Sequence, residues 1–473
     1  MRVSLFLILL PYLSLCLGNL QADVTIAPLF TDHAVLQRDK PVPIWGRADV
    51  GEKVTVTFLN QEIATFAGFD SRWAVTLAPI GTQTTGGELK VTGKNTLVLQ
   101  DVVVGEVWIC GGGSNMHLPL VSESGAGDLI VRAQFPLIRQ IKVEEMGTAS
   151  SASAGAVRVG NWQRATAPSV GEFSAVALSF AREVFQKTGV PIGLINATAK
   201  DPWTKSWLSP SAFIGAPNFA GVTEATRPTL QVLVPAPLGA ASGSQGSDKG
   251  AINPLLPYAL RGLLWQEGVV TFSQIEGYST LFAALVRTWR NHFGQGNFPV
   301  YWVQAPNRRL QGDSRSNALA VLREAQARVL ALPETAQVVA IDLDGDDRAP
   351  GVQQTIGRRL ALLAKNRIYG IVGDDSGPVF VSATKEGAAM RVRLAHANNG
   401  LVAHEIPVQS MELAGPDKVF RAASAKIERE TLLVRSPEVK TPVAVRYAWR
   451  NDPGANLYNG AGLPAAPFRS DDW

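Results

Sequence analysis

The residue best placed to do chemistry in this chain is Ser114, which follows three consecutive glycines. An apolar run at 102–110 (VVVGEVWIC) leads into the glycines at 111–113 and then the serine. A short β-branched run ending in glycines is typical of a buried strand that leaves its sheet through a tight turn. A serine just past the carboxyl end of such a strand is a candidate nucleophile. The alternative is a turn whose Ser114 or Asn115 caps the next helix.

The composition of the chain narrows the class of protein. Its 473 residues are enough for about three domains, and 46% of them are hydrophobic. The net charge of +4 includes no basic block, so nucleic-acid binding is not indicated. No Gly-Lys-Ser/Thr follows the glycines, which argues against a phosphate-binding loop. We expect no cofactor and no metal.

The first residues have the pattern of a secretory signal peptide. A basic start precedes an apolar run at 5–17, and a small residue closes the segment 1–22. We therefore expect a secreted or periplasmic protein that begins near Asp23 and has no membrane span after cleavage. Lipid attachment at Cys16 is the alternative, but the residue before it is large. Cys110 then has no partner and is expected to be an inert core thiol.

The pattern of the remaining chain changes twice. Residues 23–100 are expected to form a β-sandwich, because apolar and polar residues alternate at 53–58 and 88–91. From 101 to 370, short apolar strands alternate with longer helical segments, which predicts an α/β domain with a parallel sheet and helices on both faces. Strands return at 371–473 and predict a C-terminal β-domain.

Within the α/β region several elements have recognisable ends. Ser169 has capping-box spacing and is expected to open a helix that Gly189 closes. The segment 215–250 is rich in Gly, Ala, Ser and Pro and is expected to be a long surface loop over the site. The other expected elements are strands at 190–195, 260–265, 337–343, 390–394, 432–435 and 444–449, and helices at about 275–293, 319–329 and 353–365.

At Ser114 the sequence resembles the sialate O-acetylesterase family, within the SGNH-hydrolase superfamily of serine esterases. The family's nucleophile block is Gly-Gln-Ser-Asn-Met, and residues 112–116 here are Gly-Gly-Ser-Asn-Met. Other stretches resemble family segments in the same order: 29–38, 173–177, 189–196, 322–326, 357–361, 442–449 and 462–469. The resemblance implies a flavodoxin-like SGNH domain flanked by β-domains. It also implies hydrolysis of acetyl esters on sugars such as sialic acids, so the expected partner is an acetylated sugar or glycan.

The chain departs from the family pattern at the positions of the catalytic residues that the resemblance implies. The family carries its acid and base in an Asp-x-His-Pro block, which corresponds here to Asp347, Arg348, Ala349 and Pro350. The acid is kept and the histidine is lost. A serine hydroxyl is a poor nucleophile until a base takes its proton, so this loss is severe.

The oxyanion-binding residues also differ. The family's Trp-Gly-Gly-Thr run is replaced around Lys200 and Asp201, and its asparagine position holds Thr271, which has a hydroxyl and no amide. Gly113, which stands where the family has glutamine, is a candidate oxyanion or cleft residue beside the serine. Donors aimed at an oxyanion are worth about 10²–10³ in rate each. We expect weak or absent esterase activity, with Ser114 as nucleophile wherever activity exists.

Several alternatives stay open at this point. His117 lies three residues past Ser114, and Lys200 or Lys205 could form a serine–lysine pair, so each is a candidate base. The other histidines are expected to be structural or on the surface. The aspartates at 342, 344, 346 and 347 lack the spacing of a calcium loop.

A non-catalytic glycan-binding protein that uses the old cleft is the alternative of another class. Trp203, Trp207 and Glu267 are the candidate substrate-binding residues, whereas Trp265 is expected to pack in the core. The sequence leaves the particular sugar, the ester and the oligomeric state open.

Overall fold

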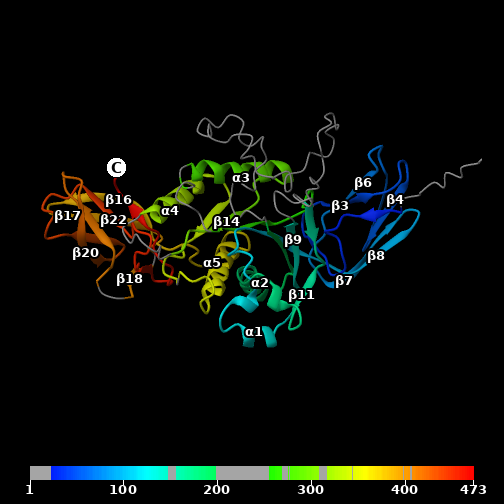
Figure 1. Ribbon diagram of the computed structural model, residues 1–473, viewed down its shortest axis with the longest axis horizontal. Helices are drawn as coiled ribbons and strands as arrows, with labels where there is room; N and C mark the ends of the chain where they lie inside the picture. The colour runs from blue at the N-terminus through cyan, green and yellow to red at the C-terminus, as the bar shows by residue number, and fades with distance from the viewer. Residues whose placement is uncertain are drawn as a thin grey trace, which may run out of the picture.

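A computed structural model gives the fold of the protein (Figure 1). It describes residues 23–146, 156–198, 255–268, 275, 277–307, 317–343, 345–397, 399–404 and 407–473. The helical region lies in the middle, with β-structure from the N-terminal part at one end and from the C-terminal part at the other. Among these residues, no helix is both long and apolar enough to cross a membrane.

A twelve-stranded mixed sheet forms the centre of the molecule. Its main path runs, in spatial order, through β10 (Ala156–Val159), β9 (Gln134–Met146), β12 (Ile192–Thr198), β8 (Thr96–Gly112), β13 (Gly262–Gln266), β14 (Val300–Val303) and β15 (Thr335–Val338). The strands from β9 to β15 along this path are parallel, as predicted. The sheet as a whole is not purely parallel, because β10 and β11 (Gln163–Thr166) pair antiparallel with β9.

Helices cover both faces of the parallel strands. α2 (Ala175–Thr188) and α5 (Val352–Arg367) contribute to a buried apolar cluster on one face, which we call the α2/α5 core. α3 (Tyr278–Phe293) and α4 (Ala318–Arg328) contribute to a second cluster on the other face. The short α1 (Gly127–Val131) follows β8. The predicted alternation of strands and helices is therefore confirmed.

The N-terminal strands are continuous with the central sheet through β8. β1 (Thr25–Ile26), β3 (Val42–Arg47) and β6 (Arg72–Leu77) form a separate sheet. β2 (Val35–Gln37) and β7 (Gln83–Thr92) pair with β8, and β4 (Lys53–Phe58) joins β7 to β5 (Gln61–Phe66). The domain boundary expected after residue 100 thus falls inside a single strand.

Strands dominate the C-terminal part. A seven-stranded sheet has the order β16-β17-β21-β20-β19-β22-β24, and β18 pairs with β23. Their bounds are β16 (Val379–Glu386), β17 (Ala389–Ala395), β18 (Leu401–Ala403), β19 (Met411–Ala414), β20 (Phe420–Glu428), β21 (Thr431–Arg435), β22 (Ala444–Tyr447), β23 (Leu457–Asn459) and β24 (Phe468–Arg469).

Two local predictions were wrong. Ser169 does not cap the long helix, because a short 3₁₀ turn follows it; α2 begins after Ser174, whose hydroxyl accepts a hydrogen bond from the Ala177 nitrogen (3.1 Å). The strand expected at 337–343 ends at Val338. Ile341, which follows this strand, lies in a loop and is buried in the apolar cluster of the C-terminal part.

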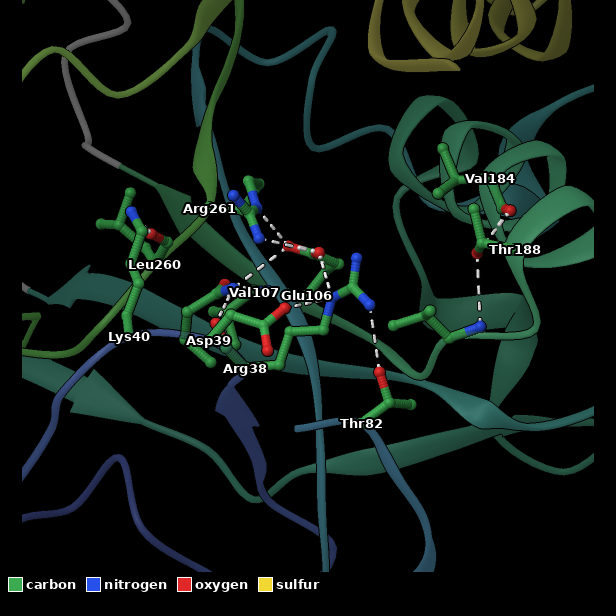
Figure 2. Close-up of polar contacts among 12 residues, drawn as sticks. Arg38, Asp39, Lys40, Thr82, Glu106, Val107, Val184, Thr188, Leu260 and Arg261 are labelled. Atoms are coloured by element: carbon green, nitrogen blue, oxygen red, sulfur yellow. Dashed lines mark hydrogen bonds and ion pairs between the residues drawn. The ribbon is translucent and has the colours of Figure 1, made fainter. Parts of the chain in front are cut away.

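A buried carboxylate in β8 joins the central strand to the N-terminal segment (Figure 2). Glu106 is fully buried and accepts hydrogen bonds from Arg38 Nε (2.6 Å) and Arg261 Nη2 (3.0 Å). Lys40 donates to the Leu260 carbonyl (2.8 Å) in the same region. These contacts join residues far apart in the sequence, so they hold β8 in place several residues before its functional end.

Candidate active site

Ser114 lies on the turn that follows β8, the central strand of the main sheet path. The chain leaves the strand through Gly112, whose φ of +123° suits a residue without a side chain. The Gly113 nitrogen donates a hydrogen bond to the Gln266 oxygen (2.8 Å), and the His117 nitrogen donates to the Ser114 oxygen (3.1 Å). The serine side chain is exposed. The turn therefore presents a hydroxyl where α/β sheets bind ligands.

Close backbone packing explains one glycine of this turn. A Cβ atom on Gly113 would lie 2.2 Å from both the nitrogen and the Cα of Gly268, so no side chain fits there. The glycine lets the nucleophile turn lie directly on the segment after β13. Its expected part in binding an oxyanion stays a prediction.

The Ser114 hydroxyl has no hydrogen-bond partner among the residues that the structure describes. All five histidines of the chain are in those residues, and none of them bonds to this hydroxyl. His33 Nδ1 lies 2.7 Å from Asp101 Oδ2, and His292 Nδ1 lies 2.7 Å from the Thr288 oxygen. The remaining two, His396 and His404, are exposed in the C-terminal part, where His404 stacks on Tyr458.

His117 is held by the end of a neighbouring strand instead of by the serine. Its Nδ1 atom contacts Oδ1 of Asn196, which lies in β12 and is 2% exposed. Burial lowers the pKa of His117 to about 4. The ring is therefore neutral near pH 7, and it is a much weaker base than an ordinary histidine. Through this contact the His117 side chain links the Ser114 turn to β12.

The acid loop does lie against the segment that follows Ser114. The Ser124 nitrogen donates a hydrogen bond to the Arg348 oxygen (3.0 Å). Gln353 Nε2 donates to the main-chain oxygen of Asp347 (3.0 Å) and lies 3.4 Å from its Oδ1. Ala349 is half-buried against the α2/α5 core. The fold thus brings this loop to the segment that follows Ser114, and the loop has Ala349 at the position where the family resemblance predicts a histidine.

The predicted substrate-binding residues are only partly described. Lys200, Asp201, Trp203, Trp207 and Thr271 lie outside the described residues, as do Lys205 and the expected loop at 215–250.

Glu267, which is described, is 6% exposed and accepts hydrogen bonds from Trp265 Nε1 (3.1 Å) and the Tyr278 hydroxyl (2.8 Å). Its contact with a substrate stays a prediction. Trp265 is fully buried, as predicted.

The segment that contains Asp342, just before the loop of Asp347, forms an ion pair. Asp342 accepts hydrogen bonds from Arg359 at 2.7 Å and 2.6 Å. No group of three or more His, Cys, Asp or Glu residues able to hold a metal occurs in the described part of the chain. Cys110 is buried, and burial raises the pKa of its thiol, so it is the inert core residue that we expected.

Sequence reasoning missed three polar residues around the turn. Asn196 holds His117, and Gln266 contacts Gly113 through its backbone. Glu123 is 2% exposed beside the acid loop, where burial raises its pKa. Asn196 and Gln266 could have been found, because each is a polar residue at the carboxyl end of an apolar strand.

We compared the sequence and the fold of this chain with those of known proteins. No family model matches the chain. A crystal structure of a carbohydrate acetylesterase from Xanthomonas citri is 32% identical, with a TM-score of 0.83, and the match covers 95% of this chain and 100% of that one. The sialate O-acetylesterase of Homo sapiens is 25% identical, covering 93% of this chain and 91% of the relative. That of Mus musculus is 24% identical, with 93% of each chain covered.

Ser114 follows the end of a central parallel strand, and the fold is shared along its length with a carbohydrate acetylesterase. The class of the protein is therefore that of the carbohydrate esterases. Within that class, the chain belongs to the sialate O-acetylesterase family.

Proposed function

We propose that this protein acts on O-acetylated carbohydrates through Ser114 and that it hydrolyses their acetyl esters slowly. Family membership and the exposed serine on its turn support the substrate class and the nucleophile. One observation carries the proposal of slow turnover: no described residue is hydrogen-bonded to the Ser114 hydroxyl, and the loop that should supply the base has Ala349.

The expected deficit is large. Removing the base of a serine triad lowers turnover by about 10⁶ in a well-studied protease. The residual rate in such variants, about 10³–10⁴ over water, comes from binding and the oxyanion hole. Here Lys200 and Thr271 replace two residues of that hole, so we expect less than this residual.

The slow reaction would follow the usual course of serine esterases. Ser114 Oγ attacks the acetyl carbonyl carbon and forms an acetyl-enzyme, while the sugar oxygen leaves with a proton. Water then hydrolyses the acetyl-enzyme and releases acetate. Without an imidazole, the proton of the serine hydroxyl passes to solvent, and solvent supplies the proton that the leaving sugar oxygen takes. Asp347 is the acid that remains on the neighbouring loop.

The missing base also favours a second function, in which the protein binds acetylated glycans and does not turn them over. Trp203 and Trp207 are the aromatic residues proposed to face the sugar in this case. In both functions the protein is proposed to be exported, since residues 1–22 have the signal-peptide pattern.

Acetate release and binding, measured side by side, test these proposals. Native protein and Ser114→Ala are incubated with O-acetylated sialic acid, and acetate is followed by proton NMR; calorimetry gives the affinity of each for the same sugar. We expect a slow release that Ser114→Ala abolishes, together with binding that it keeps. Binding without any Ser114-dependent release would support the second function, and neither binding nor release would contradict both.

A further inference from the structure

One buried side chain next to the serine turn has polar groups that nothing satisfies. Gln266 is 1% exposed, and neither its Nε2 nor its Oε1 has a hydrogen-bond partner among the described residues. Buried amides are nearly always hydrogen-bonded, because leaving them unpaired destabilises the fold. An amide kept at such a position needs a reason other than stability.

The backbone of Gln266 touches the nucleophile turn. It is the last residue of β13, and it lies opposite Gly112 of β8 in the parallel register. Its carbonyl accepts the hydrogen bond from the Gly113 nitrogen (2.8 Å). A Cβ atom on Gly112 would lie 2.1 Å from that carbonyl oxygen. The residue therefore lies against Gly112 and Gly113, the two glycines directly before Ser114.

The alternation of the strand sets the direction of the side chain. Residues two apart on a strand share a face, so Gln266 points to the same side as Leu264. Leu264 belongs to the α2/α5 core, as does Met116 from the nucleophile turn, and Ala349 packs against the same core. The amide thus lies on the face of the sheet that carries both the Ser114 turn and the loop of Asp347.

We propose that the Gln266 side-chain amide is a ligand-contact group of the Ser114 site. It takes the acetyl group of an O-acetylated sugar, with Nε2 donating to the carbonyl oxygen and Oε1 accepting from a neighbouring sugar hydroxyl. This rests on the proposed function, since it names a contact for that substrate class. A neutral amide suits carbonyl and hydroxyl groups better than a carboxylate, and it does not titrate.

The test separates a binding role from a structural one. Gln266→Met keeps the length of the side chain and removes both polar atoms. Tyr301→Phe is the matched control, because the Tyr301 hydroxyl is another buried group without a partner among the described residues, on β14. Each variant is assayed for thermal unfolding and for calorimetric affinity toward O-acetylated sialic acid.

We expect both variants to melt at or above the native temperature, since each loses an unsatisfied polar group. Gln266→Met should bind the acetylated sugar about five- to tenfold more weakly, the worth of a neutral hydrogen bond, whereas Tyr301→Phe should bind like native protein. Native affinity in Gln266→Met would overturn this inference and leave the proposed function standing. Absence of binding by the native chain would overturn both. Should Gln266→Met not fold, Gln266→Asn, which withdraws the amide by one carbon, must show the same loss.

Discussion

Replacing His117 by glutamine should make the protein less sensitive to acid. Burial lowers the pKa of His117 to about 4, against an ordinary value of about 6.5 in the unfolded chain. Between these values the unfolded chain takes up a proton that the folded chain resists. The stabilising contribution is therefore complete above pH 6.5 and is lost as the pH falls toward 4.

The size of the effect follows from the pKa difference. A shift of one unit corresponds to about 1.4 kcal/mol, so an interval from 6.5 to about 4 gives about 3 kcal/mol. Glutamine can still donate a hydrogen bond to Asn196 Oδ1 but has no proton to gain. The free energy of unfolding of native protein should thus fall by about 3 kcal/mol more than that of His117→Gln between pH 7.5 and pH 4.

Urea unfolding of both proteins at the two pH values measures this double difference, and other titrating groups cancel because both chains contain them. An equal loss of stability in the two proteins would refute the reasoning. It would mean that the ring exchanges protons freely and has a normal basicity, which would return His117 to the list of possible bases for Ser114.

The remaining predictions concern the loop, the turn and the strand that carries it. Ala349→His should raise Ser114-dependent acetate release by about 10²–10⁴, the usual contribution of general base catalysis, and an unchanged rate in a folded variant would show that the loop does not face the serine. Gly113→Ala should lower the free energy of unfolding by about 1–3 kcal/mol, because its Cβ would lie 2.2 Å from neighbouring backbone atoms. Gly127→Ala is its control: it has open space around it and should unfold at the native urea concentration or higher. Glu106→Gln should lower the free energy of unfolding by about 1–3 kcal/mol, since it takes the charge-assisted hydrogen bonds of a fully buried carboxylate away from two half-buried arginines; native-like unfolding would contradict that account.

The strands and helices that position the site could largely be predicted from the sequence. β8 was expected because a β-branched run ends in glycines, and α2 was expected to end at Gly189, which has the left-handed φ of +67° that the position requires. Short-range signals failed where tertiary packing competes with them. The apolar stretch after Val338 has the composition of a strand, yet Ile341 is buried as a loop because the C-terminal core covers it.

The site itself was harder to predict. The resemblance pointed to Ser114 and to Ala349 at the histidine position, because both belong to short blocks with a fixed spacing, and their roles stay predictions. It did not indicate that His117 would turn to Asn196, 79 positions further along the chain, or that Gln266 would lie against the glycines of β8. Such contacts depend on which strands become neighbours, and one strand's pattern holds no information about the residue opposite it.

The central claim, that the serine has lost its base, is tested most directly by adding a base from solution. Acetate release from O-acetylated sialic acid is measured for native protein with increasing imidazole, and the rate of Ser114→Ala at each concentration is subtracted. The account predicts a slow Ser114-dependent rate without imidazole that rises and then saturates as imidazole fills the space beside Ala349. A fast Ser114-dependent rate that imidazole leaves unchanged would contradict it, because another group of the chain would then already accept the proton.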